Sequence, residues 1–131
     1  LESNEEKKIG DYICKRATTT FRGRNYIAWY TLDFTTYFGP WKFNGLPGLI
    51  MEVYDETNRH HWIAQKIKTF NGEIKMPNDE SNYFKIDLKK YVELRYESPL
   101  NTNDALLPRG AMVTTFKGNR NGIEIKFEWE E

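Results

Sequence analysis

Two adjacent histidines, His60 and His61, are the side chains of this chain most typical of a metal site. Adjacent residues on a strand point to opposite faces, so the pair cannot chelate one ion together. The sequence has no third histidine and only one cysteine, Cys14, whereas zinc takes three or four protein ligands. We therefore expect no metal and no cofactor, with His61 packing beside Trp62 and His60 capping a turn.

The sequence also shows no clear candidate for a catalytic nucleophile of the hydrolase type. The serines lie in polar segments, and no Gly-x-Ser-x-Gly motif is present to activate one. The run Gly45-Leu46-Pro47-Gly48 lacks the lysine and the following hydroxyl of a phosphate-binding P-loop. A dyad of Cys14 with a histidine would need a tertiary coincidence, and no carboxylate pair stands out among nineteen acids. The sequence predicts a protein that is not an enzyme; a hydrolase with a dispersed site is the weaker alternative.

Cys14 has no disulfide partner within the chain. It lies in a strand-like run, where a buried cysteine usually acts as a small apolar side chain. We expect it to fill space in the core; the alternative is a disulfide to a cysteine that precedes this sequence.

Two arginines flank a glycine in a short turn-like step. The open backbone of Gly23 could bring the guanidinium groups of Arg22 and Arg24 toward one anion or carboxylate. The more ordinary interpretation is salt bridging to local acids such as Asp33 or Glu52, or solvation of a turn. We favour it because most pairs of surface charges contribute little free energy.

Four aromatic residues, Trp29, Tyr30, Trp41 and Phe43, form a second candidate contact set. They could line a groove for an apolar ligand or a sugar. Alternatively they form the core of a small sheet domain, and we favour this because aromatic side chains dominate burial in small domains.

The stretch 39–50 combines three glycines and two prolines with aromatic and apolar anchors, and it contains no Ser, Cys, His, Asp or Glu. Glycine reaches positive φ without a steric clash and proline fixes φ, so the stretch predicts one defined chain reversal. The residues of this structural motif are Gly39, Pro40, Trp41, Gly45, Leu46, Pro47 and Gly48.

Hydrophobic patterning predicts an α+β fold, with five or six antiparallel strands and one main helix against a face. Residues 1–8 should be frayed and residues 9–131 should form a single β-rich domain. A turn at 22–25 joins two strand-like runs, and Asp87 should cap the only good helix. The expected strands are 9–21, 25–33, 49–54, 61–70, 111–117 and 123–129, and the expected helix is 87–97.

The composition limits the function classes. Nineteen basic and nineteen acidic residues give a net charge of zero, which disfavours nucleic-acid binding. No apolar run is long enough for a transmembrane helix.

Several motifs together resemble one family. They are Cys14-x-x-Ala17, Phe21-x-Gly23-Arg24, Ala28-Trp29-Tyr30, Gly39-Pro40-Trp41 and the hexapeptide 45–50. In this order they resemble the GLPGLI family, cell-envelope proteins of Bacteroidota, and the likeness extends over residues 8–70. Family members are usually longer and carry a signal peptide, so the resemblance implies a C-terminal portion of a longer protein. It supplies no biochemical activity.

The resemblance also implies a curved half-barrel like that of periplasmic lipoprotein carriers, and a periplasmic, outer-membrane-associated or secreted location. From it we expect a non-catalytic envelope subunit that associates with an outer-membrane β-barrel or transporter. The alternative is a periplasmic carrier that holds a lipid or another apolar ligand. If strands that precede this sequence are missing from the molecule, one sheet edge lies open and needs a partner.

Overall fold

The computed structural model describes residues 2–75, 85–97 and 120–130. The chain divides into two compact units, residues 1–69 with 121–131 and residues 70–120. Among the described residues, no helix is both long and apolar enough to cross a membrane.

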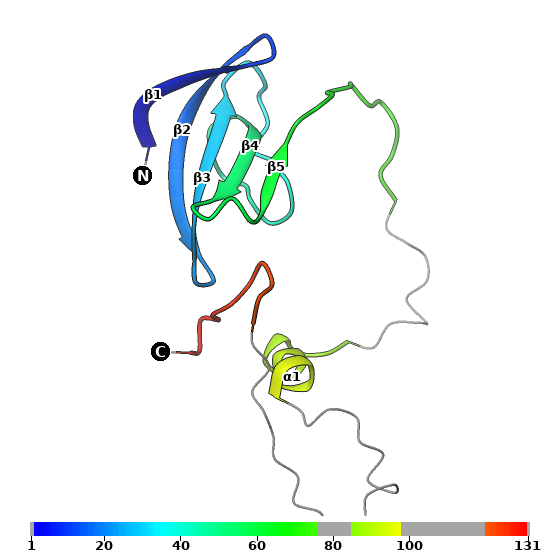
Figure 1. The fold of residues 1–131 in the computed structure, drawn as a ribbon. Coiled ribbons are helices and arrows are strands. Elements are labelled where there is room, and N and C mark those ends of the chain that lie inside the picture. Colours follow the sequence, from blue (N-terminus) through cyan, green and yellow to red (C-terminus); the bar gives the residue numbers. More distant parts are fainter. Residues whose placement is uncertain (1, 76–84, 98–119, 131) are drawn as a thin grey trace, which may run out of the picture. The chain divides into compact units, whose positions relative to one another are not determined.

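The first unit is a five-stranded antiparallel sheet whose strands lie side by side in chain order. Figure 1 shows this meander, in which β1 and β5 form the two edges. The strands are β1 (Glu2–Ile9), β2 (Tyr12–Phe21), β3 (Arg24–Thr31), β4 (Leu49–Asp55) and β5 (His61–Ile63).

The predicted turn between the first two strand-like runs is confirmed. Strand β2 ends at Phe21 and β3 begins at Arg24, so Arg22 and Gly23 alone make the turn. Both residues have positive φ, 45° and 84°, as a two-residue hairpin turn requires.

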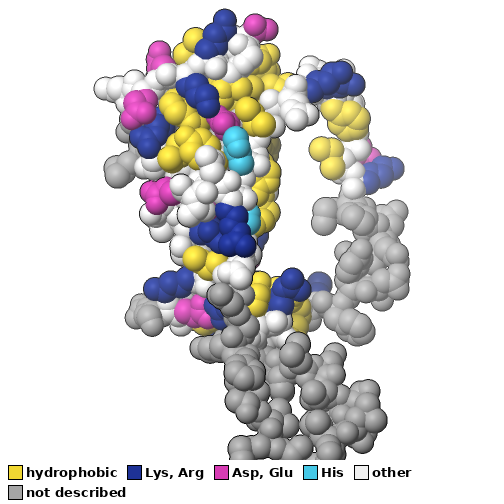
Figure 2. Space-filling view, in the orientation of Figure 1, with side chains coloured by type: hydrophobic (Ala, Val, Ile, Leu, Met, Phe, Trp, Pro, Cys, Tyr) yellow, Lys and Arg dark blue, Asp and Glu magenta, His cyan; other side chains and the backbone are white. Residues whose placement is uncertain are grey.

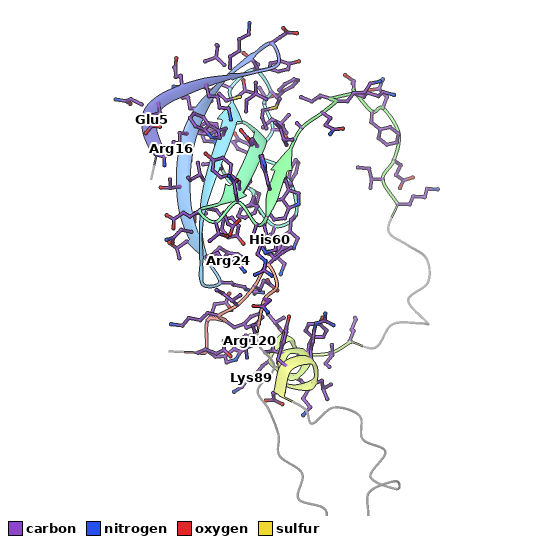
Figure 3. All side chains as sticks on the ribbon, viewed as in Figure 1. Glu5, Arg16, Arg24, His60, Lys89 and Arg120 are labelled. Atoms are coloured by element: carbon purple, nitrogen blue, oxygen red, sulfur yellow. The ribbon has the colours of Figure 1, made fainter. Side chains whose placement is uncertain are left out.

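We expected residues 1–8 to be frayed, but Glu2–Ile9 form strand β1. The charges that indicated fraying are used in pairing: Glu6 lies opposite Lys15 in the β1–β2 register, and Arg16 contacts Glu5 at 3.0 Å. Figure 3 shows Glu5 and Arg16 on neighbouring strands. Opposite charges across a strand pair stabilise it, so a charged sequence can form an edge strand.

The sheet carries an apolar cluster on each face. One cluster contains Tyr26, Ala28, Tyr30 and Val53, with Phe43 and Trp62 packed against it; the other contains Ile9, Cys14, Trp29 and Met51. Consecutive strand residues point to opposite faces, which is why Trp29 and Tyr30 belong to different clusters. Both faces of β3 are therefore covered.

The expected half-barrel is not formed by these strands. The sheet is neither closed nor strongly curled. Its edge strands β1 and β5 do not pair with each other, and a barrel requires strands that tilt and stagger until the edges meet.

One predicted strand is wrong in extent, and another is not formed. Strand β5 ends at Ile63, whereas the sequence predicted a strand through residue 70. Residues 123–129 alternate cleanly, but they form no strand and instead bind the β2–β3 turn. The strand predicted at 111–117 lies outside the described residues.

The predicted helix is present in the second unit. Helix α1 (Leu88–Val92) continues as a π-helical turn (Glu93–Glu97), and the Asp87 side chain accepts hydrogen bonds from the first N–H groups, as expected. The packing of this helix on the sheet stays a prediction.

Candidate functional site

Residues 37–48, which we call the glycine–proline loop, connect β3 to β4 and fold back on themselves. The Gly45 N–H donates to the Tyr37 carbonyl at 2.9 Å, and Phe38 pairs with Asn44 in an isolated bridge. The Ile50 N–H then donates to the Phe38 carbonyl at 3.0 Å, which ties the loop to the start of β4. The stretch thus makes one defined chain reversal, as the sequence predicts.

Glycines in this loop serve different purposes. At Gly48 an added Cβ would lie 2.0 Å from the Thr31 carbonyl oxygen, and at Gly39 it would lie 2.7 Å from Ile50 Cδ1. Gly45 has open space around it but a φ of 89°. The first two glycines allow close approach to the sheet, and the third allows a left-handed backbone.

Aromatic side chains fasten the loop to the sheet. Trp41 stacks on Trp62 of β5, with ring centroids 6.2 Å apart and planes 4° apart. Phe43 meets Tyr26 of β3 edge-on at 4.8 Å, and Trp41 meets Phe21 of β2 at 5.7 Å. Trp41 and Phe43 therefore pack against β2, β3 and β5.

The structure separates the candidate aromatic set. Tyr30, Trp41 and Phe43 lie on the loop side of the sheet, whereas Trp29 lies in the cluster on the opposite face. Of the other motif residues, Leu46 packs against the loop-side cluster and Pro47 is exposed. The four aromatics do not line one groove.

The arginine turn binds the chain's own C-terminal segment. Arg22 pairs with Glu124 and, at 3.0 Å, with Glu128, and its backbone carbonyl accepts from the N–H groups of Ile125 and Lys126. A Cβ at Gly23 would come within 2.7 Å of Ile125, so only glycine leaves room. Lys42 of the glycine–proline loop also contacts Glu124, at 2.7 Å, and so joins the loop to this segment.

Arg24 belongs to a buried polar group with Asp55, whose side chain is almost wholly buried. Arg24 contacts Asp55 at 3.3 Å and donates to the Gly122 carbonyl at 2.8 Å, and Asp55 also accepts from Thr57 and the His60 N–H. Figure 3 shows Arg24 and His60 at the same end of the sheet. Burial alone would raise the pKa of Asp55, but these hydrogen bonds and the Arg24 charge hold it below its usual value.

The expected partners of the two arginines are therefore corrected. Neither arginine pairs with Asp33 or Glu52; the acids they contact come from β4 and the C-terminal segment. These acids are distant in sequence, so spacing alone could not identify them.

Glu52 is a second buried carboxylate, and its partners differ from the arginines expected from the sequence. It lies on β4 and accepts from Lys7 Nζ at 2.6 Å, with His61 Nε2 2.8 Å from its other oxygen. Burial alone would raise the pKa of Glu52, but the hydrogen bonds from Lys7 and His61 lower it. The sequence feature that could have indicated this site is a single acid within the apolar run of β4, because a buried charge needs a partner.

Cys14 takes the core role that we favoured, but the expected packing of His61 beside Trp62 is wrong, because His60 takes that place. Cys14 is fully buried as part of the core, and burial raises the pKa of its thiol. His60 stacks against Trp62 at 6.3 Å, while His61 contacts Glu52 on the other side of the strand. Among the described residues, no group of three His, Cys, Asp or Glu side chains could hold a metal ion.

Two hollows flank the glycine–proline loop. A cavity of about 360 Å³ lies between the loop and the sheet and is mostly apolar, with Ala28, Phe43, Leu46 and Ile50 in its wall. A groove of about 700 Å³ lies on the β5 side, between Phe38 and the chain that follows β5. These hollows, and the exposed residues Tyr37 and Phe38 at the start of the loop, are places where a ligand or partner could contact this unit.

The two buried carboxylates predict acid sensitivity. Their pKa values are lowered by folding, so their contribution to stability is complete above the unfolded carboxyl range of about 4 and is lost as the pH falls through the folded values. We expect the free energy of unfolding, measured by urea denaturation, to fall steeply below about pH 4. Glu52→Gln should flatten this fall, and Glu5→Gln, at an exposed position, is the matched control. An equally steep fall in both variants would contradict the assignment.

Residues 21–52 match the model of a family described as "Protein of unknown function (Porph_ging)". This segment is a GLPGLI-family segment. The matched residues run from the arginine turn through β3 and the glycine–proline loop into β4, so the family segment contains the loop and its seat on the sheet. No curated protein and no solved structure matches the chain.

Proposed function

We propose that this GLPGLI-family chain is a non-catalytic cell-envelope subunit that docks onto an outer-membrane or transporter assembly. Its place would be the periplasm or the periplasmic side of the outer membrane. The proposal concerns binding because the central loop carries no acid, histidine, serine or cysteine between positions 39 and 50.

One observation supports docking most directly: apolar side chains are held in the open at one end of the sheet. Phe38 is 72% exposed, Tyr37 63%, Leu32 52% and Ile13 53%. Strand β2 begins, β3 ends and β4 begins at this end, which brings the residues to one region. Figure 2 shows hydrophobic side chains exposed there. We call these four residues the apolar end.

The apolar end is held in place by the loop. Hydrogen bonds to the carbonyls of Tyr37 and Phe38 fix the backbone that carries both aromatic rings. Rigid apolar side chains that face water are typical of protein interaction sites, because ordering them before binding lowers the entropy lost on association.

Site-specific photo-crosslinking tests this function. A photo-reactive residue at Phe38, in the full chain expressed in its native envelope, should give one dominant product that contains an outer-membrane β-barrel or a transporter subunit. The same residue at Glu56, an exposed position beyond the far end of β4, is the matched control. Leu32→Asp should greatly reduce the Phe38 product. Equal labelling from both positions would overturn the proposal.

A carrier of an apolar ligand is the second candidate, and the cavity beneath the loop favours it. Its volume of about 360 Å³ and its apolar wall suit a small apolar group. In the half-barrel version of this proposal, the sheet would curl further around its ligand than the described strands do. Native mass spectrometry should then find a bound ligand that Ala28→Leu displaces; an unliganded chain would count against the carrier.

A further inference from the structure

The outer edge of β5 carries backbone groups that no described strand uses. The Ala64 N–H donates to the Met51 carbonyl, and the Asp55 N–H donates to the His60 carbonyl. In an antiparallel pair such bonds occur at every second residue, so His60, Trp62 and Ala64 face β4. The backbone groups of His61 and Ile63 therefore point away from the sheet.

A groove reaches β5 from the glycine–proline loop and the start of β4. It is about 700 Å³ in volume, and its apolar lining comes from Phe38, Pro40, Met51, Ile63 and Ile67 among others. His61 and Ile63, which carry the outward backbone groups, are among its lining residues, so edge hydrogen bonds and an apolar groove are both available to an added strand.

The charges around the groove have one sign. Lys66 and Lys68 line it, and none of its lining residues is acidic. The opposite edge strand, β1, carries both signs in the run Glu5-Glu6-Lys7-Lys8. Charged side chains on a strand protect its edge from further pairing, and β5 itself carries no Lys, Arg, Asp or Glu. The two lysines beside the groove favour a partner with carboxylates.

We propose that the β5 edge binds an extended segment of a partner protein in which apolar and acidic residues alternate. The segment adds a strand antiparallel or parallel to β5, places its apolar side chains in the groove and its carboxylates beside Lys66 and Lys68. This inference rests on the proposed docking function and names the chemistry of the partner.

The test uses the full chain and a short capped peptide in which valine and glutamate alternate. On titration, the backbone amide signals of His61 and Ile63 should shift in NMR spectra, while those of β1 should not. Two control peptides separate the contributions: alternating valine and lysine removes the charge match, and N-methylation of every second amide of the acidic peptide removes its edge hydrogen bonds. Both controls should bind at least about tenfold more weakly.

Substitutions at Ile63 provide a matched pair. Ile63→Pro removes an outward N–H and leaves the ladder bonds to β4, which come from neighbouring residues; it also replaces a side chain of the groove, which the threonine variant controls for. It should weaken binding of the acidic peptide by about tenfold, and Ile63→Thr, which keeps the N–H, should weaken it much less. Replacement of Lys66 and Lys68 by glutamate should reverse the preference between the acidic and basic peptides.

Other results would overturn the inference. These are equal binding of the N-methylated peptide, protection of the His61 and Ile63 amides in the free chain, or a concentration-dependent dimer that Ile63→Pro abolishes. The dimer would assign the edge to a second copy. If crosslinking from Phe38 identifies an envelope partner and Ile63→Pro leaves that crosslink unchanged, only the β5 inference fails. If the acidic peptide binds but crosslinking identifies no envelope partner, only the docking function fails.

Discussion

Gly48→Ala should destabilise the sheet unit by about 3 kcal/mol, because overpacking at a site with no room to relax costs this much. The new methyl group would lie 2.0 Å from the Thr31 carbonyl oxygen, and that atom belongs to the backbone at the end of β3. A backbone atom cannot rotate away as a side chain can, so the loop and β3 must separate. Urea denaturation of the full chain, followed by tryptophan fluorescence, measures the change.

Gly45→Ala is the matched control within the same loop. Its Cβ would meet nothing within 4 Å, so the only cost is the left-handed backbone at φ 89°. That cost is about 1 kcal/mol. If Gly48→Ala cost no more than Gly45→Ala, close seating of the loop on β3 would be contradicted.

Arg24→Met should also destabilise the unit by about 3 kcal/mol, because removal of one partner leaves a buried charge unpaired. The charge in question is Asp55, which is 1% exposed. The variant also loses the hydrogen bonds from Arg24 to the carbonyls of Gly122 and Ile123. The C-terminal segment should therefore become more accessible to proteases.

Two comparisons make the Arg24 result specific. Arg16→Met breaks an ion pair with the exposed Glu5 and should change the free energy of unfolding by less than about 1 kcal/mol. Asp55→Asn removes the buried charge, so the double variant with Arg24→Met should lose less stability than the two single variants added together. An additive result would contradict a direct interaction between Arg24 and Asp55.

Local chemistry was enough to predict several parts of the fold. Gly23 beside an arginine marked the β2–β3 turn, the glycines and prolines of 39–50 marked a chain reversal, and Asp87 marked the helix start. Each of these features depends on backbone preferences that a few neighbouring residues determine.

Ion pairs between residues far apart in the chain could not be predicted from the sequence. Residues 2–9 have the charged pattern of a solvated tail. They nevertheless form β1, because their pairing partners lie on β2 and β4. Residues 123–129 have the pattern of a strand, yet backbone bonds to Arg22 and ion pairs hold them against a turn. Partners separated by about a hundred positions leave no local pattern to read.

Amide hydrogen exchange tests most directly whether the GLPGLI segment exists to hold the geometry of the sheet. The N–H groups of Phe43, Gly45 and Ile50 are hydrogen-bonded within or beside the loop. We predict that they exchange as slowly as the amides of β3 and β4, and that Gly48→Ala accelerates the loop and strand amides together. Fast exchange at these three loop amides beside a protected sheet would contradict the account.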